Sequence, residues 1–462
     1  MVRATERWSV ECVPGKSREG AAQRGSVVLV ALCLTTVLAV AVFGYFAVCA
    51  RTMELSNRSF CYTSSVLLAE TGMEEALWSL DQALNNSAYT WSGWTLATVS
   101  GVPTATKSLT GFTTNKGLQG TVNITVQYYS TSTPFTQPPV ITVDGISQMP
   151  DGSQIDKQLK AIVKPAALFA NAIGSTAAPN SAALSSWPYP TGNVAIVQNT
   201  SATVDSYDSS AGSYTPSSTT NRSDQAIISG PFLQFSNTSL YGYANTANSA
   251  ATDPTTSSSS ISSLSGTGVD SSRVSNSGAQ RSFDLVTPSG AGSILPTSGS
   301  ISSGYYYYYT GTWYQPSGST LTITGPATIY VSGSVDIEGS IVISSSSTGP
   351  VQFYVGGQVY IYGNGIDNRT RNPAYLGIFS PTTSGGYLYT NTSYYGVIYM
   401  PNSIVYVWGK DYNNLEVYGA LVGLNVWPYY SNIFKLHYDL NLRKTTFSMV
   451  NTPYEVTQWV TN

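Results

Sequence analysis

The longest hydrophobic pattern in the chain is an uncharged apolar run near the N-terminus. It lies between Arg24 and Arg51 and contains no acidic or basic residue. As an α-helix rising about 1.5 Å per residue, a run of this length exceeds the ~30 Å hydrocarbon thickness of a bilayer. We therefore predict a transmembrane helix over residues 26–50.

The helical pattern continues beyond that run. Residues 51–86 contain no proline and one glycine. Apolar residues recur there at three- and four-residue spacing, and acidic residues supply the polar side. We predict an amphipathic continuation of the helix over residues 51–88, with one apolar face resting on another element. Its apolar positions are Met73, Ala76, Leu77, Leu80 and Leu84.

Residues 89–168 change to the period of half-buried strands. Apolar and polar residues alternate over residues 122–128, 140–143 and 158–163, and Gly, Pro and Asn turns separate these segments. This pattern is typical of antiparallel strands with one buried face. We predict a small antiparallel sheet packed on the preceding helix.

Residues 321–445 repeat shorter alternating segments, each ended by Gly, Pro or Ser. Corners this frequent favour stacked rungs of a parallel β-helix-like solenoid, in which each rung buries its apolar face against the next. An antiparallel sandwich is the alternative. It prefers longer strands and hairpin turns of the Asn-Gly type, and only Asn364-Gly365 is such a turn in this region. The predicted fold class is α+β: a long N-terminal membrane helix, a small antiparallel sheet, and a mainly-β ectodomain with a C-terminal β-solenoid.

Residues 169–320 are rich in Ser, Thr and Gly. Such composition buries little apolar surface, so we predict β pieces and loops there, part of them a mobile linker. Within this region Asp205 and Asp208 could ligate calcium, although we favour an Asx-type turn. Residues 446–462 are predicted to be a C-terminal tail.

Composition narrows the function classes. Charged residues make up 10% of the chain and the net charge is −3, so no broad basic surface is available for nucleic acid. The four cysteines all lie within the first 61 residues, which excludes a disulfide framework for the ectodomain.

The N-terminal leader, residues 1–25, carries five basic and three acidic residues. This excess favours a cytoplasmic leader and an ectodomain outside the cell. Three fates are open for the apolar run: a signal peptide cut near Ala50, a lipoprotein modified at Cys49, or a retained helix.

The retained helix is favoured by a junction at which Gly25 follows Gln23-Arg24 and precedes Ser26. It resembles the class III leader of type IV prepilins. The resemblance implies that prepilin peptidase cleaves after Gly25, leaving Ser26 as an N-methylated mature terminus. Pilins of this family generally carry glutamate at the fifth mature position, which is Val30 here. The departure favours a minor or tip position over that of a major subunit.

Two sets of phrases extend the resemblance. QRGSVVLVAL, RTMELSNRSF and LLAETGMEEAL, in this order, resemble the N-terminal region of minor pilins of the PilX type. YYGVIYMPN, VYGA and HYD resemble the signature of a bactofilin-like C-terminal domain. These resemblances imply a structural minor pilin or pseudopilin of a type IV pilus or type II secretion-like filament. Its implied location is the bacterial inner membrane or the pilus, and its implied partners are prepilin peptidase and other pilin-like subunits.

Alternatives are an uncleaved surface adhesin or envelope scaffold and, less favoured, a polysaccharide-cleaving enzyme built on Asp336 and Glu338. His437 is the only histidine. Because Asp439 shares its strand face, we predict a structural hydrogen bond between these two rather than catalysis. We expect no enzymatic activity, metal or cofactor.

The last candidate site is an aromatic cluster. Tyr305, Tyr307, Tyr309 and Trp313 could form a surface patch that contacts a glycan or another surface, because tyrosine offers amphipathic contact area at low entropy cost. The alternative is an alternating strand with half of the rings buried.

Overall fold

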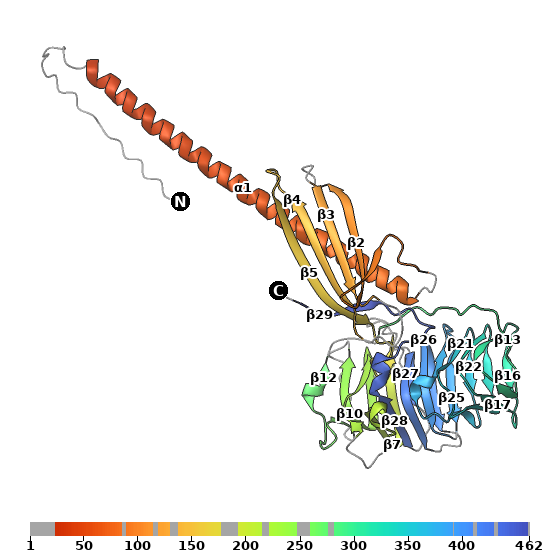
Figure 1. Ribbon diagram of the computed structural model, residues 1–462. Coiled ribbons are helices and arrows are strands. Elements are labelled where there is room, and N and C mark those ends of the chain that lie inside the picture. The colour runs from red at the N-terminus through yellow and green to blue at the C-terminus, as the bar shows by residue number, and fades with distance from the viewer. Residues whose placement is uncertain are drawn as a thin grey trace.

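The computed structural model describes residues 24–85, 89–113, 119–129, 137–176, 193–214, 221–246, 259–275, 281–390, 392–409, 414–428 and 433–460. It confirms the predicted fold class: a long N-terminal helix, a small antiparallel sheet and a β-solenoid follow one another (Figure 1). Leader residues 1–23 lie outside the described residues.

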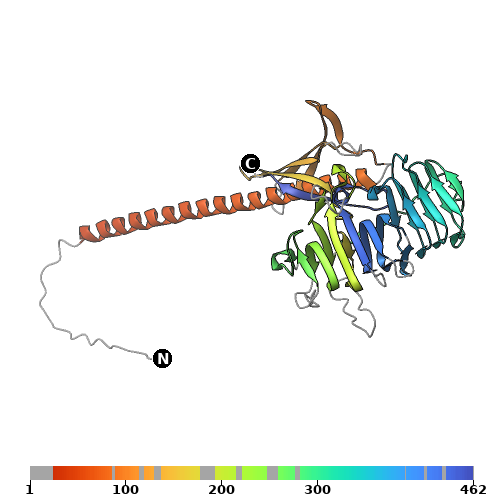
Figure 2. The ribbon, with the colours of Figure 1, turned by 90° about the horizontal axis from the view of Figure 1, so that it is seen from below.

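Helix α1 (Arg24–Asn85) is one continuous helix of 62 residues, about 90 Å long. It joins the predicted membrane segment to the predicted amphipathic segment without a break. Among the described residues it is the one helix long and apolar enough to cross a membrane. Its N-terminal part extends away from both the sheet and the solenoid (Figures 1 and 2).

The small sheet packs on the C-terminal part of α1, as the alternating pattern predicts. All of its strands are antiparallel to their neighbours. Ala69, Met73 and Leu80 of the helix share one core with Val122 and Val143 of the sheet. In spatial order the strands are β1 (Thr95–Val99), β2 (Val102–Thr113), β3 (Gln119–Gln127), β4 (Val140–Gln148), β5 (Gln154–Pro165) and β29 (Tyr454–Trp459).

Gly145 allows a close approach of helix and sheet. A Cβ atom there would lie 2.1 Å from the Ser65 carbonyl oxygen and 2.5 Å from the Ala69 nitrogen. Because backbone atoms cannot move aside like a flexible side chain, Gly145→Val is expected to lower the free energy of unfolding by about 1–3 kcal/mol. Urea unfolding of the full chain in detergent measures this. Gly44→Ala is the control, since nothing lies within 4 Å of that Cβ; equal stability of both variants would contradict the packing.

The solenoid has three faces, and each coil contributes one strand to each face. The first face comprises β14 (Gly299–Ile301), β17 (Thr320–Ile323), β20 (Ser340–Ile343) and β23 (Gly365–Asn368). The second comprises β15 (Gly304–Tyr308), β18 (Ala327–Val331), β21 (Val351–Val355) and β24 (Leu376–Phe379). The third comprises β16 (Trp313–Gln315), β19 (Val335–Ile337), β22 (Val359–Ile361) and β25 (Gly386–Thr390). Strands along each face pair in parallel.

The next two coils are single long strands, β26 (Tyr394–Gly409) and β27 (Leu415–Pro428). β26 pairs with β24 of the second face and with β25 of the third. They pair in parallel along most of their length. β28 (Ile433–Asp439) then adds a strand on β27.

An earlier pass of the chain builds the other end of the solenoid. Its strands are β6 (Ile173–Ser175), β7 (Asn193–Tyr207), β9 (Ala226–Gly230), β10 (Phe232–Thr246), β11 (Ser260–Ser262) and β12 (Val274–Ser275), which pair in parallel. β8 (Arg222–Ser223) adds an antiparallel edge to β7. Residues 281–292 then lead to the opposite end, where β13 (Ser293–Ile294) pairs with β15.

The two passes meet in the middle, where β27 pairs with β6 and β7, and β28 pairs with β7. In Figure 1 the green and teal ends therefore enclose the blue C-terminal coils. The parallel rungs begin at β6, well before residue 321, which corrects the predicted start of the solenoid. The Ser/Thr-rich composition does not indicate these rungs, because only the inward-facing positions of a rung need apolar side chains. Val204, Ile228 and Leu240 occupy such positions.

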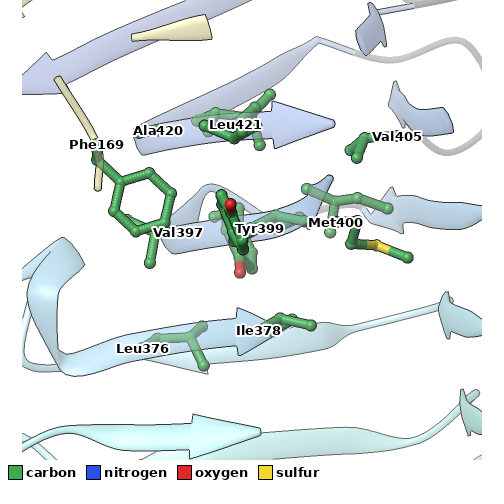
Figure 3. Close-up of a cluster of buried hydrophobic side chains, with 14 of the residues drawn as sticks. Phe169, Leu376, Ile378, Val397, Tyr399, Met400, Val405, Ala420 and Leu421 are labelled. Atoms are coloured by element: carbon green, nitrogen blue, oxygen red, sulfur yellow. The ribbon is translucent and has the colours of Figure 1, made fainter. Parts of the chain in front are cut away.

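The second face is covered on its outer side as well. Figure 3 shows Phe169 beside Val397 and Tyr399. The Tyr399 hydroxyl donates to the Phe283 carbonyl at 3.0 Å and accepts from the Phe283 amide at 2.6 Å. Phe447 packs on Phe169 with ring centroids 5.3 Å apart. Residues that precede the solenoid strands in sequence, such as Phe169, and residues that follow them, such as Phe447, thus form a second buried layer on the outer side of this face.

The C-terminal segment is not a tail. Phe447, Met449 and Val450 are buried in the solenoid core, and β29 then pairs with β5. The Ala166 amide donates to the Pro453 carbonyl at 2.7 Å, so the two connections between sheet and solenoid run side by side. This double connection joins the solenoid to the sheet that packs on α1.

Candidate functional site

The apolar half of α1 is the largest exposed hydrophobic surface of the described chain. Its side chains from Val27 to Val48 are mostly exposed, and no charged residue lies between Arg24 and Arg51. Leaving such a surface in water is unfavourable by roughly 25 cal/mol per Å². The apolar half of α1 is therefore compatible with membrane anchoring.

A short charged segment separates the exposed apolar half of α1 from the half that packs on the sheet. Arg51, Glu54 and Arg58 supply its charges, and Cys61 is the first fully buried residue, with its Sγ 3.6 Å from the Gln148 carbonyl oxygen. The sheet thus begins just outside the apolar part, a spacing that leaves room for a membrane interface.

The predicted processing residues, Gly25 and Ser26, lie in the first turn of α1. The Ser26 side chain is not among the described ones. No part of the described sheet or solenoid surrounds this turn in Figure 1.

The predicted aromatic patch is partly wrong. Trp313 is fully buried, because its side chain points into the solenoid at the start of β16, and Tyr314, 44% exposed, points outward instead. Tyr305 and Tyr307 are half-buried and Tyr309 is 55% exposed. The Tyr307 and Tyr309 rings stack with centroids 4.6 Å apart.

His437 pairs with a different aspartate from the one predicted. Its Nδ1 lies 2.6 Å from Oδ1 of Asp205, which faces it in register across β7 and β28. Both side chains are buried. Since an ionised carboxylate can only accept, the ring nitrogen donates this hydrogen bond. Pairing across the junction of the two passes places these residues, 232 positions apart, together.

Asp205 also accepts hydrogen bonds on Oδ2. The donors are Nε of Arg222 at 2.6 Å and the Tyr214 hydroxyl at 2.8 Å. The Tyr214 ring stacks on His437 with centroids 3.8 Å apart. The cluster joins residues of the first pass to β28, the last strand of the solenoid. Its role is therefore structural: it holds the two passes of the chain together and closes the solenoid at this junction.

Asp208 and Asp439 cap short turns. Asp208 accepts from the Ser210 amide at 2.9 Å, which confirms the predicted Asx-type turn for this residue but not for Asp205. Asp439 accepts from the Ser209 and Asn441 amides at 3.2 and 3.1 Å. Within the described ranges, no group of three or more His, Cys, Asp or Glu residues is placed to hold a metal.

Burial raises the pKa of Asp439 above its ordinary value of about 3.9. An acid whose pKa rises on folding favours the folded state below about pH 4, and this contribution is lost as pH rises through the raised pKa. Asp439→Asn keeps the accepting oxygen and removes the charge. We expect the variant's stability relative to the natural chain to increase from pH 4 to pH 7 in urea titrations. A pH-independent difference would contradict the assignment.

Asp336 and Glu338 project from the third face next to Tyr314, whose hydroxyl donates to Oε2 of Glu338 at 2.7 Å. Burial, and secondarily the Glu338 charge, raise the pKa of Asp336. The two carboxylates lie at one end of a larger aromatic surface, which single-residue reasoning missed.

This surface, the aromatic strip, consists of two columns on the third face. In the first, the Tyr360, Tyr387 and Tyr406 rings stack with centroids 4.5 and 4.8 Å apart and ring planes within 11°. In the second, Tyr362, Tyr389 and Trp408 follow at 4.8 and 5.8 Å. The signal was a Tyr-x-Tyr or Tyr-x-Trp triplet in three successive rungs, YIY, YLY and YVW.

The comparisons with known proteins add one match. The family model described as Domain of unknown function (DUF7305) matches residues 248–445, which include the aromatic strip and His437 but not Asp205. No curated protein and no solved structure matches the chain.

Proposed function

We propose that the chain is a minor pilin-like or pseudopilin-like structural subunit that displays a β-solenoid outside the cell. The observation that carries this proposal is the division of α1. One half is apolar and exposed along its length, and the other half forms the core of a separate antiparallel sheet. Such a helix joins a folded ectodomain to a hydrophobic environment that the chain itself does not provide.

The leader supports processing by prepilin peptidase. Cleavage between Gly25 and Ser26 would leave the whole apolar half at the new N-terminus, where it could pack with other pilin-like subunits or remain in the inner membrane. The excess of basic residues in the leader supports a cytoplasmic leader and an external solenoid.

Val30 supports a minor or tip position. A carboxylate at this fifth mature position could pair with the terminal amine of a neighbouring subunit in a low-dielectric filament core. Val30 is 58% exposed and apolar, so this subunit offers only packing contacts there. The solenoid lies at the far end of α1 from Val30 (Figure 2), which leaves the apolar half accessible to partners.

A processing variant tests the proposal. In cells with prepilin peptidase, the natural chain is expected to appear in the sheared surface fraction together with other pilin-like subunits. Gly25→Leu is expected to remain in the membrane fraction with its leader attached. The matched control, Gly20→Leu, changes a glycine elsewhere in the leader and should behave like the natural chain. Membrane retention of all three chains would instead support an uncleaved adhesin or envelope scaffold.

A further inference from the structure

The solenoid is inserted between the last two strands of the sheet on α1. β5 ends at Pro165, just before the solenoid segment, and β29 begins at Tyr454, just after it. Register pairing places these two residues opposite each other. The strand that completes the sheet therefore follows the rest of the sheet by nearly 300 residues, and the whole solenoid lies between.

β29 contacts α1 and the sheet core mainly through its first residues. The Tyr454 amide donates to Oδ1 of Asp81 on α1, and the Tyr454 side chain is buried in the core that α1 shares with the sheet. The strand becomes exposed towards its end, where Trp459 is 55% exposed. Because β29 buries so little apolar surface, its docking alone is weakly favourable.

The folded solenoid positions the residues just before β29. Met449 is buried in the solenoid core, and its carbonyl accepts from the Val286 amide at 2.9 Å. The Asn451 amide donates to the Asp284 carbonyl at 2.9 Å. Val286 and Asp284 belong to the segment that leads from one end of the solenoid to the other. The start of β29 is thus fixed by contacts that exist only when both passes are in place.

An unfolded solenoid would not bring β5 and β29 together. The entropy lost when a flexible loop closes grows with the logarithm of its length, so it is large for a loop of nearly 300 residues. An edge strand of six residues, half of them exposed, does not offset it. The folded solenoid removes this cost, because the bond from the Ala166 amide to the Pro453 carbonyl holds its entry and exit side by side.

We infer that β29 is a latch, which completes the sheet on α1 only when the two passes of the solenoid have closed on each other. Folding of the solenoid and completion of the sheet are then coupled. Because such coupling is reciprocal, release of β29 also loosens residues 447–451 of the solenoid. A chain with an open solenoid lacks the edge strand beside β5. The inference concerns this chain alone and does not depend on the proposed function.

Hydrogen exchange of the full chain in lipid nanodiscs tests the latch. Asp205→Ala weakens the junction between β7 and β28 without changing a residue of the sheet. We expect residues 453–460 to exchange about tenfold faster or more in this variant, and β3 to exchange as in the natural chain. The same readout decides if the whole solenoid unfolds, because the sheet should still lose β29 and keep β3. Unchanged exchange of residues 453–460 with faster exchange of β28 would overturn the inference.

The reciprocal variant is Asp81→Ala, which removes the acceptor of the Tyr454 amide on α1. We expect faster exchange of residues 453–460 and of residues 447–451, with β20 unchanged. Asp81→Asn keeps an acceptor oxygen and should restore the natural exchange. The control is Glu70→Ala, which removes a different, exposed carboxylate of α1. Faster exchange confined to residues 453–460, or equal effects of the Asp81→Ala and Glu70→Ala variants, would contradict the latch.

Discussion

Replacing Asp205 by alanine is expected to lower the free energy of unfolding by about 3–5 kcal/mol, because it removes one partner of a buried ion-pair cluster and leaves the others unpaired. Asp205 is fully buried and accepts from His437, Arg222 and Tyr214. His437 belongs to the last strand of the solenoid, whereas the other partners belong to the first pass. The loss should therefore open the junction between β7 and β28 before the rest of the solenoid.

Urea unfolding and amide hydrogen exchange of the full chain measure this effect. The matched control is Asp208→Ala, which removes a capping carboxylate three residues away and is expected to cost about 0.5–2 kcal/mol. Faster exchange in β28 with unchanged exchange in β20 would support the closure. Equal stability of the two variants, or uniform loss of protection, would argue against it.

Replacing Leu38 by arginine is expected to cost about 2.5–3.5 kcal/mol for membrane insertion, since it places a charge near the middle of the apolar half of α1. The ratio of inserted to translocated chain in a membrane-vesicle assay measures this cost. Filament entry should fall with it, because the same surface would pack against other subunits.

Leu67→Arg is a closely matched control. Leu38 and Leu67 lie on the same helix and are 59% and 57% exposed, but Leu67 lies beyond Cys61, where the sheet packs on α1. The control should insert like the natural chain. If both arginine variants insert equally well, the apolar half of α1 does not span the membrane.

Local patterns predicted the elements whose partners are near in sequence. The period of residues 51–88 identified the helix face that packs on the sheet, and the alternation in residues 122–163 identified three of its strands. These features depend on side-chain spacing within one element, which the sequence displays directly.

The remaining features depend on pairings between distant segments. Nothing in the sequence near His437 indicates that β28 pairs with β7. The sequence therefore points to Asp439, on the same strand face, rather than to Asp205. β29 likewise pairs with β5 after nearly 300 intervening residues. Such contacts follow from the order in which two passes fill one solenoid, which periodicity does not reveal.

The alternation of outward and inward side chains changes its phase at the corner before Trp313. The alternation through Tyr305, Tyr307 and Tyr309 suggested that odd-numbered residues face outward, but the chain turns at Gly311, which has a positive φ of 65°. After this turn Trp313 points inward and Tyr314 outward. Burial can be extrapolated along a strand but not across a glycine corner.

Assembly or anchoring through the apolar half of α1 requires that this half remains in the mature protein after the leader is removed. Mass spectrometry of the N-terminal peptide of the protein purified from cells tests this most directly. We expect a peptide that begins at Ser26 and carries an N-terminal methyl group. A peptide that begins at Met1, or one that begins beyond Ala50, would contradict this expectation.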